Sequence, residues 1–471
     1  MTGAFQTVIS LLFAALFLGG IRLMHSPRTA VAGNLLGALG MLGAIVATLA
    51  AGGLISIRLL WASLFAGTVI GYVLAIRVTM IRMPQMVALL NGLGGAASAG
   101  AAIVVMTGVQ GGRPEFFTAA LALLVGCVTF SGSMVAALKL DRKLPQRPMV
   151  LPMHTAVSVF ILMISGALVA AVPFVSKGGM GAVSDAIIAL ALLYGIVFTI
   201  RIGGADMPIT ISLLNSLSGL AASIAGFAVR DLLLITAGAI VGSAGLILTR
   251  IMCRAMNRSL MDILLGGAAA LSPFSPGGSP APDFSENKEP ATREHDSEAG
   301  DNRETAVNLL RKAKTIIIAP GYGMALSQAQ HQVKELFDLL EKNGKDVLFA
   351  IHPVAGRMPG HMNVLLAEAD VPYEKLFEME AVNHLFPETD VAIVVGANDV
   401  VNPAASTAQG TPIYGMPILL AGEAKFIVIF NKDTRPGYAG VENPLYHRDN
   451  VALFLGDAAE EIAEVTQKLR N

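Results

Sequence analysis

A glycine-rich turn in the C-terminal third of the chain carries the clearest chemistry in this sequence. The turn reads Gly321-Tyr-Gly323-Met-Ala325, and it follows a short β-branched run at residues 316–318. Apolar residues then recur at helical spacing over residues 326–340. A strand, a glycine turn and a helix form the context in which Gly-x-Gly-x-x-Gly/Ala binds a dinucleotide. The glycines admit a tight turn and a close pyrophosphate, and the small third residue packs the helix. The turn predicts a nucleotide site, with an ordinary strand–helix connection as the alternative.

The loops after the next strands indicate which nucleotide. The run at residues 346–351 ends in His352-Pro353, without the Asp or Glu that would hold the ribose 2′-hydroxyl of NAD. Arg357 follows, and a guanidinium binds a phosphate through a bidentate fork. A second basic loop, with Lys432 and Arg435, follows the run at 426–430. Unless these are solvated surface charges, they favour the 2′-phosphate of NADP.

No residue pattern indicates a chemical catalyst or a metal site. Cys127 and Cys253 are far apart, and no Ser-His-Asp order or metal-ligand spacing occurs. The scattered histidines of the C-terminal part are expected to be structural: His331, His352, His361 and His384. A hydride transfer requires only a placed nicotinamide and a donor, so one nucleotide site implies a second nucleotide elsewhere.

The composition places most of the chain in a membrane. Of its 471 residues 54% are hydrophobic and 14% charged, and the mean hydropathy is +0.63, whereas a soluble protein has about 25% charged residues. The net charge of −1 creates no overall positive field that would favour binding to nucleic acid. We predict nine transmembrane helices, around 6–24, 30–51, 59–76, 84–107, 116–138, 155–175, 183–201, 208–228 and 232–252.

Basic residues between the runs predict the orientation. One alternate set of connections and span ends holds Arg22, Arg28, Arg77, Arg82, Lys139, Arg142, Lys143, Arg147, Arg201, Arg250, Arg254 and Arg258. The other set holds only Arg58, Arg113, Lys177 and Arg230. The positive-inside rule puts the first set in the cytoplasm. The N-terminus is then outside and the C-terminal part is cytoplasmic.

Three segments follow from these patterns. Residues 1–265 are the transmembrane domain, and residues 266–304 are a Pro-, Gly- and Ser-rich, then acidic, linker that is expected to be flexible. Residues 305–471 are a Rossmann-like α/β domain with a parallel, doubly wound sheet. Its strands are expected near 316–318, 346–351, 390–395, 417–420, 426–430 and 451–455. Its ligand is expected beyond their carboxyl ends.

Polar residues on two spans suggest either helix packing or a wet path. Asn91, Gly95, Ser98 and Ala102 share one face of the fourth span, and Ser212, Asn215, Gly219 and Ala222 share one face of the eighth, near Ser218 and Ser223. The serines and glycines are typical of helix packing. The two asparagines favour a wet path, because an amide inside the membrane is costly unless it has a hydrogen-bonding partner. Asp206, before the eighth span, is either a cap or a coupling residue, and His154 is expected at the membrane interface.

Longer motifs resemble a known family. They are Gly321-Tyr-Gly-Met-Ala325, the run from His352 to Ala369, Gly396-Ala-Asn-Asp399, Asn402-Pro-Ala-Ala405 and Gly437-Tyr-Ala-Gly-Val-Glu-Asn-Pro444. The membrane part adds Arg201-Ile-Gly-Gly-Ala-Asp-Met-Pro208, Ser212-Leu-Leu-Asn215 and Met252-Cys-Arg-Ala-Met-Asn-Arg258. Together they resemble the β subunit of the proton-translocating nicotinamide nucleotide transhydrogenase, over all of the chain except the linker.

The resemblance implies an activity, partners and a location. The C-terminal domain would bind NADP(H), and an α subunit would carry NAD(H) and further membrane helices. Hydride would pass between the nicotinamides while a proton crosses the membrane. A dimer of α–β units in a bacterial inner membrane is expected. The motifs favour a membrane subunit of this enzyme over two alternatives. One alternative is an NADP(H)-gated transporter or channel without hydride transfer, and the other is an anchor for a soluble dehydrogenase.

The resemblance also implies site residues. Those expected around the nucleotide are Gly321, Tyr322, Gly323, Ala325, Val354, Ala355, Gly356, Arg357, Met358, Pro359, Gly396, Ala397, Asn398, Asp399, Gly415, Met416, Lys432, Asp433, Gly437, Tyr438, Asp457 and Ala458. The loop 432–438 would close over the cofactor and hold its 2′-phosphate. Asp399 would couple nucleotide state to protonation, and Asn91, Asp206, Asn215 and Ser218 would belong to the proton path.

Two departures from the family pattern stand out. Some members carry a histidine, the usual proton carrier, at the position of Asn91, and an amide cannot cycle through protonation near neutral pH. The carrier would then lie elsewhere, on an α-subunit helix or at Asp206 with bound water. Asn431-Lys432 stands where other members have Lys-Arg, so one cation is lost and weaker binding is expected.

Overall fold

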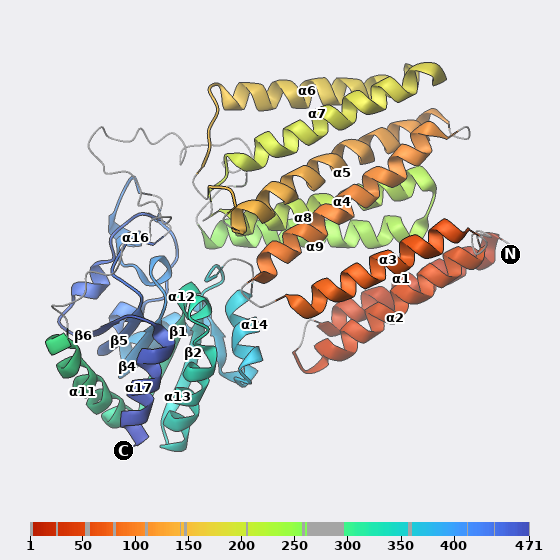
Figure 1. Cartoon of the computed structure of the whole chain (residues 1–471). Coiled ribbons are helices and arrows are strands. Elements are labelled where there is room, and N and C mark those ends of the chain that lie inside the picture. The colour runs from red at the N-terminus through yellow and green to blue at the C-terminus, as the bar shows by residue number, and fades with distance from the viewer. Residues whose placement is uncertain are drawn as a thin grey trace. The chain divides into compact units, whose positions relative to one another are not determined.

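The computed structural model describes residues 3–24, 27–51, 57–78, 82–108, 112–141, 143–145, 148–203, 206–256, 260, 296–356, 360–411, 413–437 and 439–470. The chain divides into two compact units, Met1–Arg250 and Ile251–Asn471. The first is helical, and the second contains the sheet (Figure 1).

The first unit consists of long apolar helices. They are α1 (Gly3–Met24), α2 (Pro27–Ala51), α3 (Arg58–Arg77), α4 (Met83–Thr107), α5 (Arg113–Leu140), α6 (His154–Ala171), α7 (Met180–Ile200), α8 (Met207–Val229) and α9 (Leu232–Ala255). Among the described residues, eight helices are long and apolar enough to cross a bilayer. The apolar stretch found in α1, Leu11–Met24, is shorter than the roughly 17 residues of a span. The multi-span helical fold is therefore confirmed, and the described residues contain eight of the nine predicted spans.

Helix α5 is the centre of this unit. It packs against α4, α7 and α8, and its residues Leu123 and Ala136 are fully buried. Small residues permit this packing: a Cβ on Gly95 of α4 would lie 2.8 Å from the carbonyl oxygen of Gly126 on α5. The predicted face of α4 is confirmed, since Asn91, Gly95, Ser98 and Ala102 are all buried.

Helices α8 and α9 meet along a seam of glycines and serines. A Cβ on Gly219 would lie 2.4 Å from the Gly242 nitrogen, so the two main chains touch. The hydroxyl of Ser216 donates to the Gly242 carbonyl at 2.6 Å, and that of Ser212 donates to the Gly245 carbonyl at 3.4 Å. The serines and glycines of the eighth span therefore serve helix packing, as one of the two interpretations predicted.

The second unit is built on one parallel sheet. Its strands are β1 (Thr315–Pro320), β2 (Asp346–Ile351), β3 (Leu376–Glu378), β4 (Val391–Val395), β5 (Phe426–Asn431) and β6 (Val451–Leu455), in the order β3-β2-β1-β4-β5-β6. The doubly wound α/β fold is confirmed. The strand predicted at 417–420 is wrong: the segment is buried at Leu419 but pairs with no described strand, since the Leu419 amide donates to the Val400 carbonyl. The three-residue β3 was not predicted.

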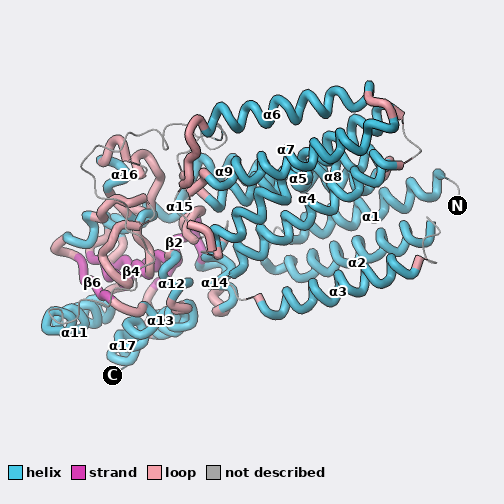
Figure 2. The backbone as a smooth tube through the Cα atoms, turned by 45° about the horizontal axis from the view of Figure 1, so that its top comes forward, coloured by secondary structure: helices cyan, strands magenta, loops and turns pink. Residues whose placement is uncertain are grey.

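Helices cover both faces of the sheet. The longer ones are α11 (Asp296–Lys312), α13 (Gln330–Lys342), α14 (His361–Glu368) and α17 (Ala458–Arg470), and the short ones are α12 (Tyr322–Leu326), α15 (Met379–Val382) and α16 (Ala404–Thr407). Helices α11, α13 and α17 lie on one side of the strands and α16 on the other (Figures 1 and 2). The α16 side holds a core that includes Ile317, Val394, Ile429 and Leu419. Helix α11 begins inside the segment predicted as a linker, whose residues 266–295 lie outside the described ones, and the three domain boundaries stay a prediction.

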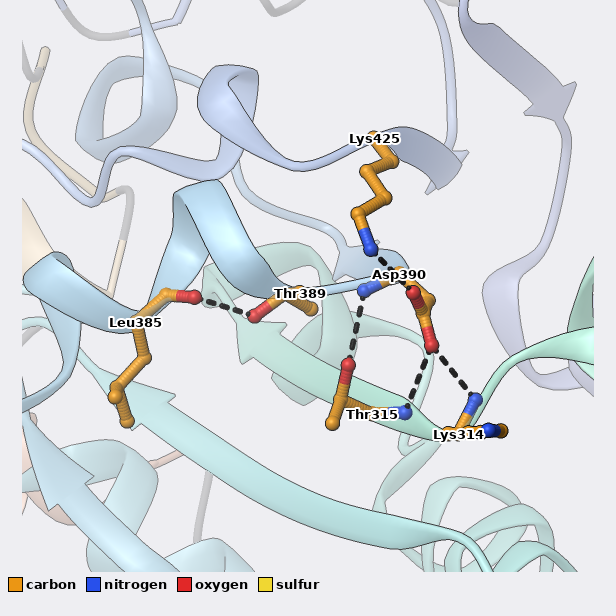
Figure 3. Close-up of polar contacts among 6 residues, drawn as sticks. All are labelled: Lys314, Thr315, Leu385, Thr389, Asp390 and Lys425. Atoms are coloured by element: carbon orange, nitrogen blue, oxygen red, sulfur yellow. Dashed lines mark hydrogen bonds and ion pairs between the residues drawn. The ribbon is translucent and has the colours of Figure 1, made fainter.

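The amino edge of the sheet is tied by Asp390 (Figure 3). Its carboxylate accepts the backbone N–H of Lys314 at 2.8 Å and of Thr315 at 3.2 Å, and it pairs with the ammonium of Lys425 at 2.8 Å. The Lys425 ammonium and these amides hold the pKa of the carboxyl well below its usual range. One carboxylate thus joins the beginnings of β1, β4 and β5.

Candidate nucleotide site

The strand order places the site at the other edge. β1 and β4 are neighbours, and the chain winds outward from them in both directions, so the sheet has its topological switch point between their carboxyl ends. Ligands of such sheets bind in the crevice outside that point. The loops that follow β1, β2, β4, β5 and β6 all begin at this edge. They contain the residues predicted for the nucleotide.

The glycine turn after β1 packs directly on the turn after β4. The Gly321 N–H donates to the Val395 carbonyl and the Gly323 N–H to the Gly396 carbonyl, both at 2.8 Å. A Cβ on Gly321 would lie 2.4 Å from the Gly396 oxygen. Both glycines are therefore required by turn-to-turn packing, a role that the expected pyrophosphate contact did not include. The helix predicted over residues 326–340 is also broken, because Gln328 adopts φ 52° between α12 and α13.

Tyr322 and Ala325 lie on α12. Ala325 is buried, as the packing role of a small third residue requires. The Tyr322 ring lies 6.3 Å from the ring of His361, the first residue of α14. The β1 and β2 loops are thus adjacent.

The loop after β2 is anchored by a buried histidine. The His352 Nδ1 accepts the N–H of Val354 at 3.2 Å, so its Nε2 carries the proton and donates to the Pro417 carbonyl at 2.9 Å. Burial lowers the pKa of His352 to about 4, which keeps the ring neutral. The expected structural role of His352 is thereby confirmed. It ties the Val354–Gly356 loop to the segment that follows Gly415 and Met416.

Gly356 and Gly415 hold left-handed backbone in these two segments, at φ 108° and 75°. A Cβ on Gly356 would lie 2.4 Å from the His361 Nδ1. Ala355 is buried, and the Met416 N–H donates to the Ile413 carbonyl. Four predicted site residues, Arg357, Met358, Pro359 and Tyr438, lie outside the described residues.

The loop after β4 meets the loop after β5 at Asp399. The Asp399 carboxylate accepts the Ala439 N–H at 3.0 Å, and a Cβ on Gly437 would lie 2.6 Å from it. The Asn398 side chain donates to the Arg435 carbonyl at 2.9 Å. The turn that ends at Asp399 thus holds the loop predicted to close over the cofactor.

Two cations of that loop differ in their surroundings. Arg435 is engaged with Asp433 through its backbone N–H at 3.0 Å and its guanidinium at 2.5 and 2.9 Å. Lys432 is exposed, and its backbone N–H is bound to the Asn431 side chain at 3.0 Å. Lys432 is therefore better placed than Arg435 to meet an external phosphate.

A buried network behind the loop was missed by sequence reasoning. The Asn431 amide donates to the Tyr446 hydroxyl at 2.8 Å, and that hydroxyl donates to the Ala397 carbonyl at 3.3 Å. Asn443 donates to Asn398. Burial raises the pKa of Tyr446 to about 12, so its hydroxyl stays protonated. The one signal in the sequence was Asn431 itself, a polar amide at the end of the apolar β5.

Asp457 and Ala458 lie at the beginning of α17. The Asp457 carboxylate accepts the Ala459 N–H at 2.8 Å and so caps the helix. The preceding Gly456 N–H donates to the Asn431 carbonyl at 3.0 Å. This contact joins the β6 turn to the base of the Lys432 loop.

The membrane unit brings together some of the predicted polar residues. The Asn91 side-chain amide of α4 donates to the Ser133 hydroxyl of α5 at 2.9 Å, and the Ser218 hydroxyl of α8 donates to the backbone carbonyl of Asn91 at 3.5 Å. Asn215 is half-buried on α8. Asp206 occupies the N-cap position of that helix, without a side-chain capping hydrogen bond. In the part of the chain that the structure describes, no group of three metal-binding side chains gathers.

Comparison with known proteins identifies the family. The family model described as the NAD(P) transhydrogenase beta subunit matches residues 6–468. The NAD(P) transhydrogenase subunit beta of Rhodospirillum rubrum is 40% identical over 483 aligned positions that cover 100% of both chains, and a second sequence of that name from a defined strain of the species matches equally. Together with the apolar helices and the parallel sheet, this match shows that the chain is an integral membrane protein and belongs to the NAD(P) transhydrogenase beta subunits, a family of oxidoreductases that use nicotinamide nucleotides.

Proposed function

We propose that this chain binds NADP(H) at the carboxyl edge of its sheet. Hydride then passes between that nucleotide and NAD(H) on a partner α subunit, while a proton crosses the membrane. The observation that carries the proposal is the packing of the Gly321 turn on Gly396 at the β1–β4 switch point. Doubly wound parallel sheets bind their ligands beside such a switch point.

The residues present fit a dinucleotide. The β1 and β4 turns would form its floor, the Val354–Gly356 and Gly415–Met416 segments would form walls, and the 432–438 loop would lie over it. When bound, the nicotinamide supplies the hydride chemistry. The chain's own contribution is to hold the ring in one orientation and to keep water away from it.

Lys432 is proposed to bind the 2′-phosphate. Its side chain is exposed, and Asn431 fixes its backbone. The ammonium therefore extends from a main-chain position that is held in place. Arg357, outside the described residues, is proposed as a second cation. Because Asn431 bonds to Tyr446, we expect a weaker phosphate site than one with two adjacent cations.

Asp399 is proposed to couple nucleotide binding to protonation. As a carboxylate it accepts the Ala439 N–H and lies against Gly437. A proton on it would weaken that acceptor, which would loosen the loop over the cofactor. The charge on one side chain would then govern how tightly the loop holds NADP(H).

The proton path is proposed to pass Asn91, Ser218, Asn215 and Asp206. The Asn91–Ser133 and Ser218–Asn91 hydrogen bonds support a polar line among α4, α5 and α8. An amide relays hydrogen bonds but does not carry the proton. The carrier is therefore assigned to Asp206 with water or to a partner helix.

The assembly is proposed to be a dimer of α–β units in a bacterial inner membrane. The N-terminus would be outside and the nucleotide domain cytoplasmic, as the basic residues favour. The partner follows from the relatives' name, in which this chain corresponds to subunit beta.

The decisive assay uses membranes that contain this chain and its α subunit. NADPH should reduce an NAD analogue, and the reaction should acidify or alkalinise the vesicle interior in proportion to turnover. NADPH binding without any hydride transfer would contradict the enzyme and favour a nucleotide-gated transporter.

The phosphate assignment is tested with Lys432→Ala. Loss of a charge-assisted contact of about 1.5–3 kcal/mol should weaken NADPH binding about 10- to 150-fold and leave NADH binding almost unchanged. Lys342→Ala is the matched control, because Lys342 is exposed at the end of α13, next to the amino edge. Equal losses for NADPH and NADH would refute the assignment.

A further inference from the structure

The C-terminal end of α7 lies inside the membrane unit and needs hydrogen-bond donors. The last four carbonyls of a helix have no partner within it. In a bilayer each unsatisfied backbone group costs several kcal/mol. Phe198 and Thr199 of this last turn are buried, and so are Arg201 and Ile202 beyond it. The structure must therefore supply donors from other elements.

Lys139 of α5 is the principal donor. It is only 1% exposed and is among the largest fully buried side chains of the described residues. Its ammonium donates to the carbonyls of Ile200 at 2.5 Å and Ile202 at 2.9 Å. A cation at the negative end of the α7 dipole is also electrostatically favourable. The sequence places Lys139 among the basic residues of the connections and span ends, and the structure shows that its ammonium also caps the end of α7.

Two further donors add to the cap. His154, the first residue of α6, accepts the Leu151 N–H through Nδ1, so its Nε2 carries the proton and donates to the Val197 carbonyl at 3.0 Å. The Met149 N–H donates to the Ile200 carbonyl at 3.3 Å. His154 is thus a buried capping residue at the first position of α6, and its predicted place at the membrane interface stays a prediction. Segments before α6 and at the end of α5 fix one turn of α7.

The capped turn leads directly to Asp206. Lys139 holds Ile202, and Asp206 follows four positions later as the N-cap of α8, with residues 204 and 205 outside the described ones. The other end of this short segment is fixed too. Met207 and Ile211 are buried against Ala136 and Leu140, which flank Lys139 on α5. One helix therefore anchors both sides of the segment that carries the carboxylate.

We propose that Lys139 is a positioning residue for Asp206. Its ammonium fixes the end of α7 at Ile200 and Ile202, and its neighbours on α5 pack against the beginning of α8, so that the Asp206 carboxylate is held in one place. The inference rests on the proposed proton path for its functional consequence. The positional part stands on the geometry of Lys139, Ile200 and Ile202 alone.

The functional test replaces the ammonium and keeps the volume. In membranes with the α subunit, Lys139→Met should lower the coupled hydride-transfer rate about tenfold and leave the KM for NADPH within about twofold. Lys139→Arg, which keeps donors for the carbonyls, should recover a substantial part of the rate. The matched control is Lys143→Met, which removes the same charge from an exposed lysine four residues on, paired with Asp141 at 2.7 Å. This control should behave as the unchanged protein.

The positional test does not depend on turnover. Gly203→Cys introduces a thiol beside the end of α7, where its Cβ would meet Pro148 at 3.3 Å and no other described residue within 4 Å. The native Cys127 and Cys253 are buried and should not react. Labelling by a water-soluble maleimide should become several-fold faster when Lys139→Met is added, and should not change with Lys143→Met.

The two tests together decide the proposal. A lost rate with unchanged labelling would overturn positioning and make Lys139 a direct participant. Faster labelling with an unchanged rate would overturn the link to Asp206. If the unaltered pair transfers no hydride, the proposed function fails while the labelling result still decides the position. Should Lys139→Met not accumulate in membranes, Lys139→Gln, which keeps one donor group, takes its place with the same outcomes.

Discussion

The α8–α9 seam of the membrane unit and the β1–β4 turns of the nucleotide domain both press main chain against main chain at glycines. In the seam, Gly219 meets the Gly242 nitrogen within ordinary helix geometry. In the turns, Gly396 meets the Met324 nitrogen, where a Cβ would lie 2.3 Å away, and it also adopts φ 62°. The seam requires only space at its glycines. The turn requires space and a left-handed backbone at the same residue.

The difference teaches what each region can tolerate. Two helices can separate slightly along their length and keep most contacts, because the side chains around the seam can rearrange. Two turns joined by the Gly321 and Gly323 hydrogen bonds have no such freedom, since each is also the end of a buried strand. We therefore expect a methyl group to be more damaging in the turn than in the seam.

The largest effect is expected for Gly396→Ala. The methyl group would overlap the backbone of Gly323 and Met324, and the left-handed conformation adds about 1–2 kcal/mol. Destabilisation of the nucleotide domain by about 4 kcal/mol or more should follow. Calorimetry of the purified chain should show the loss, and NADPH binding should disappear with it.

Gly410→Ala separates the two causes. Gly410 adopts φ 80°, and a Cβ added there would meet none of the described residues within 4 Å, so the backbone cost of about 1–2 kcal/mol applies. Equal destabilisation by the two substitutions would show that the close approach at Gly396 contributes nothing.

A smaller effect is expected for Gly219→Ala. The added methyl group must push α9 away from α8, and overpacking of this kind costs about 1–3 kcal/mol. Gly166→Ala on α6 is the control, because its Cβ meets nothing within 4 Å and alanine favours a helix. In detergent, the unfolding temperature of Gly166→Ala should lie above that of the unchanged chain, and that of Gly219→Ala should lie below it. The reverse ranking would refute the seam as a contact that depends on space.

The sequence predicts the parts of this fold that rest on local patterns. The buried β-branched runs at β1, β4 and β5 mark central parallel strands, because such strands are apolar on both faces. The same signal fails at residues 417–420, which are apolar because Leu419 is buried and not because they pair in the sheet. β3 has three residues, too few for any period to appear.

The candidate site was predictable to the same extent. Its glycine turns follow from the motif, but their contact with each other arises between segments some 75 residues apart, as Gly321 and Gly396 show. Tyr446 and Lys139 could not be recognised, since the groups that give them a role are backbone carbonyls and amides brought in by folding. A polar side chain that bonds to backbone groups far away in the sequence leaves no periodic pattern by which it could be predicted.

The third prediction compares neutral seam contacts with an ionic one. Asp390→Asn removes the charge that holds three strand beginnings (Figure 3) and should cost about 2 kcal/mol near neutral pH. The folded carboxyl has a lowered pKa, against about 3.9 in the unfolded chain. Its stabilisation is therefore complete above that unfolded value and is lost as the pH falls toward the folded one.

Urea unfolding at several pH values should display this dependence. The difference between the unchanged chain and Asp390→Asn should stay constant from about pH 5 to 8 and shrink below about pH 4. Glu335→Gln is the control, because the Glu335–Arg470 pair is largely exposed and such pairs contribute about 0–1 kcal/mol. A difference that grows on acidification would contradict the assigned role of Asp390.

The smallest effect is expected for Tyr446→Phe, which tests a neutral hydroxyl in the nucleotide domain against the serine hydroxyls of the seam. The substitution keeps the ring and removes the hydrogen bonds to Asn431 and Ala397. One such bond contributes about 1 kcal/mol, and the Asn431 amide would be left without this acceptor. NADPH affinity should fall a few-fold, because Asn431 fixes the backbone of Lys432. Tyr373→Phe, at an exposed tyrosine, should change neither stability nor affinity. If Tyr446→Phe lowers stability and leaves NADPH affinity unchanged, the network supports the fold without positioning the phosphate loop.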